Sequence, residues 1–192
     1  PILFDEKIAA KKVNLDPKDD LIATSASNNY EGVTLKEVEA FYAKIVDKTN
    51  PEPISYGLNS KLVKENGKLV EKTWKVGGMY SPAIEKIVFW LEKADALAEN
   101  ENQKKALDLL IEFYKTGELK KFDDYNIAWV SDTNSVIDVV NGFIEVYGDP
   151  IGYRGAYESV VSIKDIEASK RIQAISKQAQ WFEDNSPLMP EH

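Results

Sequence analysis

The chain has 192 residues and carries 32 acidic against 24 basic side chains, which gives a formal net charge of -8 at pH 7. This charge argues against general binding to nucleic acid or to an anionic membrane, because both attract basic surfaces. The absence of cysteine excludes disulfides and thiol chemistry, and no apolar run approaches the roughly 18 residues of a transmembrane helix.

The first clear element along the chain is a helix. Residues 1–33 have weak periodicity, whereas Thr34 and Glu37 form a capping box that predicts a helix over residues 35–47. The prolines within residues 50–53 end this helix and favour an extended segment after it. Its apolar face is formed by Val38, Phe41, Tyr42 and Ile45.

A β-hairpin is predicted next, over residues 54–64 and 68–76. The pair Asn66-Gly67 lies between them and favours a type I′ turn, because both central residues of that turn need a positive φ. A two-residue connection of this kind sets Val63 opposite Val70.

Three helices are predicted after the hairpin. The first begins with Ser81 as the capping side chain and Pro82 at its first position. The second covers residues 102–116 and stops at Gly117, and the third covers residues 118–130. Short connections predict that the three helices pack as neighbours.

A second hairpin is predicted after these helices. Its first strand covers residues 141–147, with a start as early as Val136 left open, and its second covers residues 156–163. The turn at residues 148–152 carries two glycines and one proline. A last helix begins near Asp165 and ends at residues 185–187. Its expected buried stripe is formed by Ile172, Ile175, Ala179 and Phe182. The predicted fold class is therefore α+β, predominantly helical, with hairpins that form a small antiparallel or mixed sheet.

The first strand of the second hairpin presents a carboxylate beside a phenol. Alternation puts Phe143, Glu145 and Tyr147 on one face, with Ile144 and Val146 on the other. From spacing alone, the solvated face of a half-exposed strand is the simpler interpretation of this pair.

Asp149, Arg154 and Glu158 are interpreted as structural rather than catalytic. An arginine beyond a glycine-rich turn can hold carbonyls or a carboxylate with its planar fork. His192 is the single histidine, and one histidine cannot assemble the three protein ligands of a catalytic zinc. No metal is therefore expected on this chain.

Residues 143–155, FIEVYGDPIGYRG, with Glu158 beyond them, resemble the strand and loop of the dipeptidyl peptidase III family. Members of this family are zinc metallopeptidases that release dipeptides from peptide N-termini. Residues 55–60, the segment around residues 80–93 and the helices after it also resemble the family, so the resemblance covers nearly the whole chain.

The resemblance implies roles for two residues of the second hairpin. The glutamate that matches Glu145 binds the free α-amino group of the substrate, which is a charge-assisted contact. The tyrosine that matches Tyr147 points at the scissile carbonyl, where a phenol can donate to the oxygen as it becomes negative. Asp149, Arg154 and Glu158 keep their structural interpretation.

The family's zinc-binding helices, one with a His-Glu-x-x-Gly-His motif and one with a Glu-Glu motif, have no counterpart in this sequence. The chain is therefore expected to be a piece of a two-lobed zinc peptidase, inactive alone. Residues 1–164 would belong to the substrate-binding lobe, and residues 165–192 would form a helix leading to the zinc-binding lobe. The resemblance thus also implies that this helix can lack its packing partners in this chain. The expected partners are an oligopeptide substrate and that missing lobe, without nucleic acid or membrane. The expected compartment is the cytoplasm, with the periplasm as an alternative.

Two other functions stay open from the residues alone. A stand-alone α+β binding module would need the Glu145 face to line a pocket complete within this chain. A glycosidase-like enzyme would need a second carboxylate roughly 5 to 10 Å from Glu145 across a cleft.

Overall fold

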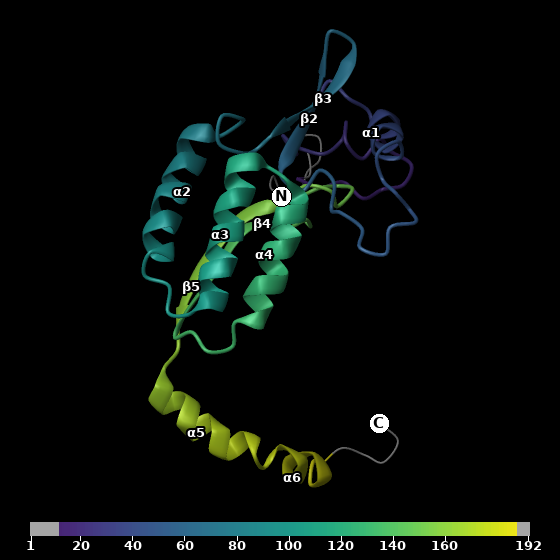
Figure 1. Cartoon of the computed structure of the whole chain (residues 1–192). Helices are drawn as coiled ribbons and strands as arrows, with labels where there is room; N and C mark the ends of the chain where they lie inside the picture. The colour runs from purple at the N-terminus through teal and green to yellow at the C-terminus, as the bar shows by residue number, and fades with distance from the viewer. Residues whose placement is uncertain (1–11, 188–192) are drawn as a thin grey trace, which may run out of the picture.

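The computed structural model describes residues 12–187, and the predicted α+β fold class is confirmed. Within this range the strands form two separate small sheets, one of three strands and one of two. Three helices, α2 (Ser81–Asp95), α3 (Glu101–Thr116) and α4 (Leu119–Ser131), stand side by side in front of the two-stranded sheet, and the three-stranded sheet lies at one end of this layer (Figure 1).

The three-stranded sheet is mixed and joins distant parts of the chain. Strand β1 (Tyr30–Glu31) pairs parallel with β2 (Ser60–Glu65), which pairs antiparallel with β3 (Lys68–Thr73). Between β2 and β3, Asn66 and Gly67 have φ angles of 50° and 78°, so the predicted turn with two positive φ angles is confirmed. The predicted register is also confirmed, since Val63 lies opposite Val70.

The predicted strands of this first hairpin are too long, because residues 54–59 and 74–76 lie outside β2 and β3. In the first of these segments the chain turns, and the Leu58 N–H donates to the carbonyl of Ser55 at 3.2 Å. Gly57 in this turn has a φ of 88°, a conformation that no strand residue adopts.

Helix α1 (Leu35–Tyr42) begins with the predicted capping box. The Thr34 hydroxyl accepts from the Glu37 N–H, and the Glu37 carboxylate accepts from the Thr34 N–H. The helix ends at Tyr42 rather than at residue 47. The Lys44 N–H then donates to the Phe41 carbonyl at 3.3 Å and the Ile45 N–H to the Tyr42 carbonyl at 3.1 Å, and the Asp47 carboxylate accepts from the Thr49 N–H at 2.8 Å. Such local turns compete with continuation of a helix.

Helices α3 and α4 match their predicted bounds to within one residue. The side chain of Asn100 caps α3 by accepting from two backbone N–H groups, and Gly117 ends the helix with a φ of 77°.

The predicted cap of α2 is wrong. Tyr80 occupies the N-cap position, and the Ser81 hydroxyl instead accepts from the Gly77 N–H at 2.6 Å.

The second hairpin consists of β4 (Ile137–Glu145) and β5 (Ala156–Ile163), which pair antiparallel. The predicted bounds of β5 are confirmed, whereas β4 begins earlier and ends before Tyr147. The register shifts between Phe143 and Glu145, so that Ile144 is the extra residue of a β-bulge. Phe143 is buried and Glu145 is exposed, so the predicted shared face is wrong for Phe143.

Phe143 joins β4 to the larger of two apolar cores, the one between α2, α3 and α4. Its ring lies 4.9 Å from the ring of Trp74 and 6.4 Å from that of Phe113. Burying a side chain of this size stabilises a fold by about 1.5 to 3 kcal/mol. Gly142 allows α4 this close, because a Cβ there would lie 2.6 Å from the Phe122 ring.

The smaller core lies between α1 and the three-stranded sheet. It contains Tyr30, Val38, Tyr42 and Leu62, all at most 9% exposed. Tyr153, which follows the turn of the second hairpin, stacks on Tyr42 with ring centroids 4.5 Å apart. The turn of the second hairpin therefore packs against the first sheet and α1.

The predicted last helix is two helices, α5 (Ile166–Ser176) and α6 (Ala179–Asp184), which lead away from the helix layer (Figure 1). The side chain of Asp165 caps α5. The expected buried stripe is wrong, because Ile172, Ile175 and Phe182 are each more than half exposed and neither helix has a buried residue. No element of the described chain covers this stripe.

Candidate functional site

Glu145 and Tyr147 both lie exposed at the end of β4. Glu145 is the last residue of the strand and pairs with Ala156 of β5. Tyr147 lies beyond the ladder and is 75% exposed. Ile144 and Val146 alternate with them and are half-buried. The carboxylate and the phenol therefore stand on the accessible side of the chain, one held by strand pairing and the other by a turn.

The turn after β4 is closed by Asp149. Its N–H donates to the carbonyl of Val146 at 3.0 Å, and its own carbonyl accepts from the Gly152 N–H at 3.2 Å. Its Oδ2 accepts from the N–H groups of Tyr153 (2.7 Å) and Arg154 (2.9 Å). Asp149 is only 4% exposed. Asp149 thus fixes the start of this loop through its backbone and the end of the loop through its carboxylate.

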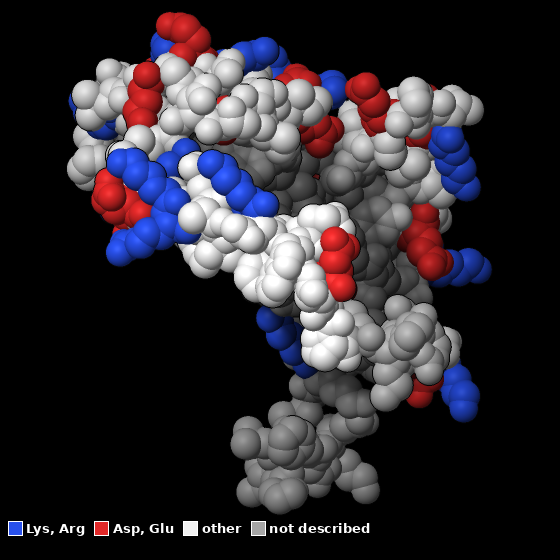
Figure 2. Space-filling view, turned by 90° about the horizontal axis from the view of Figure 1, so that it is seen from below, with Lys and Arg blue, Asp and Glu red and all other residues white. Residues whose placement is uncertain are grey.

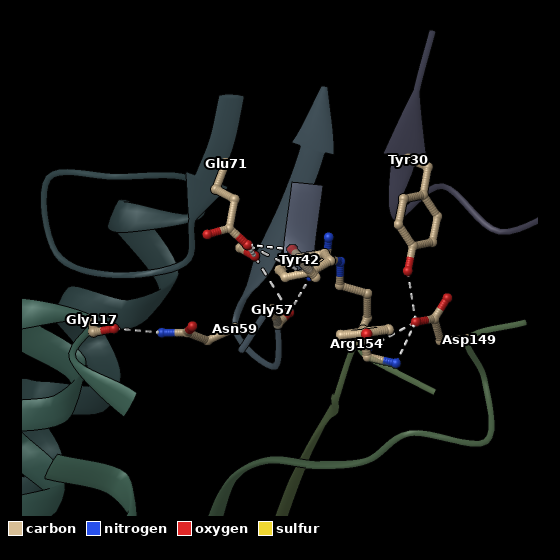
Figure 3. A network of polar contacts seen from close by, with 10 residues as sticks. Tyr30, Tyr42, Gly57, Asn59, Glu71, Gly117, Asp149 and Arg154 are labelled. Carbon is tan, nitrogen blue, oxygen red and sulfur yellow. Dashed lines mark hydrogen bonds and ion pairs between the residues drawn. The ribbon is translucent and has the colours of Figure 1, made fainter. Parts of the chain in front are cut away.

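A third donor reaches the same carboxylate oxygen from the other sheet. The hydroxyl of Tyr30, on β1, donates to Asp149 Oδ2 at 2.8 Å (Figure 3). Burial raises the pKa of Tyr30 well above its usual range, the nearby Arg154 opposes this rise, and Asp149 adds to it. The Tyr30 phenol therefore stays protonated and remains a donor.

Arg154 is 1% exposed, and its side chain links the start of β5 to the turn before β2. Its Nη1 donates to the carbonyl of Gly57 at 2.8 Å and lies 3.7 Å from Glu71 Oε1 (Figure 3). The guanidinium carbon lies 5.0 Å from the ring centre of Tyr30 and 5.1 Å from that of Tyr42. Two aromatic rings and one carboxylate thus surround a cation that water does not reach.

Glu71, on β3, accepts hydrogen bonds near the guanidinium of Arg154. Its Oε1 accepts from the hydroxyls of Tyr42 and Ser60, the latter at 2.8 Å. Burial raises the pKa of Tyr42 well above its usual range, Arg154 opposes the rise and the bond to Glu71 adds to it. Asn59, next to this cluster in Figure 3, donates to the carbonyl of Gly117 at 3.0 Å and so joins the turn to the end of α3.

Glu158 stands apart from this network. It lies half-buried on β5 opposite Gly142. No contact joins it to Asp149 or Arg154 in the described part of the chain.

Sequence reasoning selected Asp149 and Arg154 but missed Tyr30, Tyr42 and Glu71, which surround them. Tyr30 falls in a stretch without periodicity, and Glu71 is an ordinary charged residue of a strand. Tyr30 and Asp149 are 119 positions apart. No local spacing in the sequence indicates such a contact.

An apolar pocket of about 610 Å³ lies between the two cores. It is lined by Ile144 and Val146 on β4, by Phe122 and Trp129 on α4, and by Tyr153 after the turn. Glu145 and Tyr147 do not line it. The requirement of a stand-alone binding module, a pocket lined by the Glu145 face, is not met by this pocket.

The described residues do not fit a zinc site. Between residues 12 and 187, no three or more His, Cys, Asp or Glu side chains are grouped so that they could hold a metal ion.

Acidic and basic side chains are interspersed around a broad uncharged area on the face shown in Figure 2. In the same range, no helix has both the length and the apolar character needed to cross a membrane.

The sequence model of peptidase family M49 matches residues 28–191. Dipeptidyl peptidase 3 of Homo sapiens is 31% identical over 113 residues, which make up 59% of this chain and 15% of that protein. Dipeptidyl peptidase 3 of Nematostella vectensis is 33% identical over 103 residues, 54% of this chain and 14% of that protein. Nudix hydrolase 3 of Arabidopsis thaliana is 32% identical over 111 residues, 57% of this chain and 14% of that protein.

Two solved structures share the fold. Dipeptidyl peptidase III from Caldithrix abyssi superposes with a TM-score of 0.62 at 21% identity, over 94% of this chain and 34% of that one. Dipeptidyl peptidase III from Corallococcus sp. strain EGB gives a TM-score of 0.58 at 23% identity, over 93% of this chain and 31% of that one.

The chain thus corresponds to about a third of each solved structure and to a smaller share of the curated relatives. The family model nevertheless covers most of its length, including both hairpins and the helix layer. The chain therefore belongs to peptidase family M49, the dipeptidyl peptidase III family.

Proposed function

We propose that this chain is the substrate-holding part of a peptidase that releases dipeptides from the N-terminus of oligopeptides. Membership of peptidase family M49 supports this proposal. The zinc of the complete enzyme would be bound by a zinc-binding lobe that this chain does not contain. The substrate would be an oligopeptide with a free N-terminus.

Within this proposal Glu145 binds the α-amino group of the substrate. Its carboxylate is exposed, and pairing with Ala156 fixes the backbone that carries it. A carboxylate at the end of a paired strand is suited to binding an ammonium group at one fixed position, because charge-assisted hydrogen bonds are short and strong. The role of Glu145 is to define where the peptide begins.

Tyr147 would donate a hydrogen bond to the scissile carbonyl oxygen. The observation that carries the proposal is that Tyr147 stands 75% exposed in a turn whose fourth residue, Asp149, is buried and held by three donors. A donor whose backbone is already held needs less reorganisation to meet developing negative charge. Asp149 and Arg154 would hold this geometry as a structural brace, and Glu158 would support the hairpin beside them.

Residues 1–164 are assigned to the substrate-binding lobe, and residues 165–192 to the connection with the zinc-binding lobe. The exposed stripe of α5 and α6 supports this division, because apolar side chains on one face of a helix favour contact with another part of the protein. A stand-alone binding module has less support, since Glu145 lies outside the apolar pocket.

The test is the steady-state kinetics of two variants of the complete enzyme. Glu145→Gln removes a charge-assisted hydrogen bond worth about 1.5 to 3 kcal/mol, so KM should rise by about 10- to 150-fold with kcat retained. Tyr147→Phe should lower kcat by about a hundredfold or more with KM unchanged, as for the loss of one oxyanion donor.

Matched controls are available on exposed residues elsewhere. Glu65→Gln at the end of β2 and Tyr80→Phe before α2 make the same chemical changes away from the second hairpin. Both should leave kcat and KM unaltered. If Glu145→Gln kept its KM, or Tyr147→Phe kept its kcat, the corresponding role would be withdrawn.

A further inference from the structure

Glu145 and Tyr147 are held by different means. Glu145 belongs to the β4–β5 ladder, whereas Tyr147 follows the ladder and lies in the turn closed by the Asp149 N–H and the Val146 carbonyl. The direction of the Tyr147 side chain therefore depends on where Asp149 is fixed.

Asp149 is fixed from two sides. Two of its donors, the N–H groups of Tyr153 and Arg154, belong to the same loop and move with it. The third donor, the Tyr30 hydroxyl, is the one that ties the carboxylate to a different element (Figure 3). Loop-internal bonds define the shape of the loop. The stacking of Tyr153 on Tyr42 and the bond from Arg154 to Gly57 also join the loop to the first sheet and α1, and the Tyr30 bond adds the anchor that acts on the Asp149 carboxylate itself.

Tyr30 is itself held rigidly. It pairs with Leu62 of β2, which is 0% exposed, and its ring packs over the guanidinium of Arg154 at 5.0 Å. Only the hydroxyl reaches Asp149, at 2.8 Å. The ring therefore anchors Tyr30 by contacts that do not depend on its hydroxyl group.

We propose that Tyr30 is a positioning residue for Tyr147: its hydroxyl anchors Asp149, and Asp149 sets the turn from which the Tyr147 phenol reaches the substrate carbonyl. This inference rests on the proposed role of Tyr147. It predicts that the hydroxyl of a buried residue on β1, an element that carries neither Glu145 nor Tyr147, controls the chemical step and leaves recognition of the substrate amino group unchanged.

The test is Tyr30→Phe in the complete enzyme, because this change removes the hydroxyl and keeps the ring. Misplacement of a catalytic donor by a fraction of an ångström lowers kcat by about tenfold, and KM should stay unaltered because Glu145 is held by the ladder. The control is Tyr125→Phe, which removes an equally buried hydroxyl that donates to the Val139 carbonyl at 3.1 Å. This control should keep full kcat.

A double-mutant cycle separates positioning from a general loss of structure. If Tyr30 acts through Tyr147, then Tyr30→Phe should have no further effect on kcat in a Tyr147→Phe background. An equal loss of kcat in both backgrounds, or a loss of kcat in Tyr125→Phe as large as that in Tyr30→Phe, would overturn the positioning role. So would a Tyr30→Phe variant with unaltered kcat.

These outcomes are distinct from failure of the proposed function. If Tyr147→Phe lowers kcat but the effect of Tyr30→Phe is independent of it, only the positioning role of Tyr30 is lost. If Tyr147→Phe keeps full kcat, the proposed role of Tyr147 is lost and the positioning role with it.

Discussion

Arg154 and Gly57 lie 97 positions apart in the chain and are joined by a hydrogen bond of 2.8 Å from Nη1 to the Gly57 carbonyl. A Cβ on Gly57 would lie 1.8 Å from that same Nη1. Gly57 also has a φ of 88°. Arg154 can therefore occupy this position only if residue 57 has no side chain. Its hydrogen bond to Gly57 joins the segment before β5 to the segment before β2.

Gly57→Ala is expected to be strongly destabilising. The positive φ alone costs about 1 to 2 kcal/mol for a residue with a Cβ, and displacing Arg154 from a packed site adds about 1 to 3 kcal/mol. Gly67→Ala is the control, because Gly67 has a φ of 78° but open space around it. Denaturant unfolding should show a distinctly greater loss for Gly57→Ala, and equal losses would contradict the steric account.

Arg154→Ala should lower the free energy of unfolding by about 3 to 5 kcal/mol, as expected when one partner of a buried ion pair is removed. The change leaves the Gly57 carbonyl without its donor and Glu71 without its cation. Lys170→Ala removes a cation from the exposed pair with Glu167, and it should change stability by less than about 1 kcal/mol. Chemical denaturation of both variants measures the difference, and similar values would argue against a brace.

Stability should fall at alkaline pH through the buried phenols. Burial raises the pKa values of Tyr30 and Tyr114 well above the usual range of a phenol, and it raises the pKa of Tyr125 to about 12. Above about pH 10 the unfolded chain loses phenol protons that the folded chain keeps, so the free energy of unfolding declines. Below that pH these phenols are protonated in both states and their contribution is constant.

The measurement is the free energy of unfolding as a function of pH for the unaltered chain and for Tyr114→Phe. Lysines titrate in the same range but are common to both proteins, so the difference between the two curves isolates the phenol. The difference should be constant below about pH 10 and should shrink above it. A difference that grows with rising pH would contradict the assigned direction.

The isolated chain should hydrolyse no peptide, with or without added zinc, because donors that position a substrate do not replace a metal-activated water. Release of dipeptides from an arylamide substrate by the purified chain is the measurement. A variant carrying both Glu145→Ala and Tyr147→Phe is the control for a contaminating peptidase. Activity that this control abolishes would contradict the prediction.

Local signals in the sequence predicted most of the fold. The capping box of Thr34 and Glu37, the Asn66-Gly67 turn and the helix end at Gly117 each act within a few residues of themselves. Each signal depends only on interactions between residues that are close in sequence, and the structure has the turn or helix end where each signal indicated. The bulge at Ile144 has no such signal, so the alternation that predicted a shared face for Phe143 and Glu145 failed there.

The surroundings of the candidate site could not be predicted in this way. Glu145, Tyr147, Asp149 and Arg154 were selected from one hairpin, but Tyr30 reaches them from another sheet. The apolar stripe of α5 was expected to be buried because apolar side chains favour burial, yet in the described chain no partner covers Ile172 or Ile175. Contacts set by tertiary packing, or by another part of the protein, leave no local pattern.

The proposed binding of the free N-terminus by Glu145 is tested by comparing one peptide with its N-acetylated form in the complete enzyme. The measurement is the ratio of kcat/KM for the free over the acetylated peptide, in the unaltered enzyme and in Glu145→Gln. The ratio should be at least about 10 in the unaltered enzyme, because acetylation removes the charge that forms the hydrogen bond. In Glu145→Gln, where that bond is already lost, the ratio should be several-fold smaller. An undiminished ratio in Glu145→Gln would show that Glu145 does not bind the α-amino group.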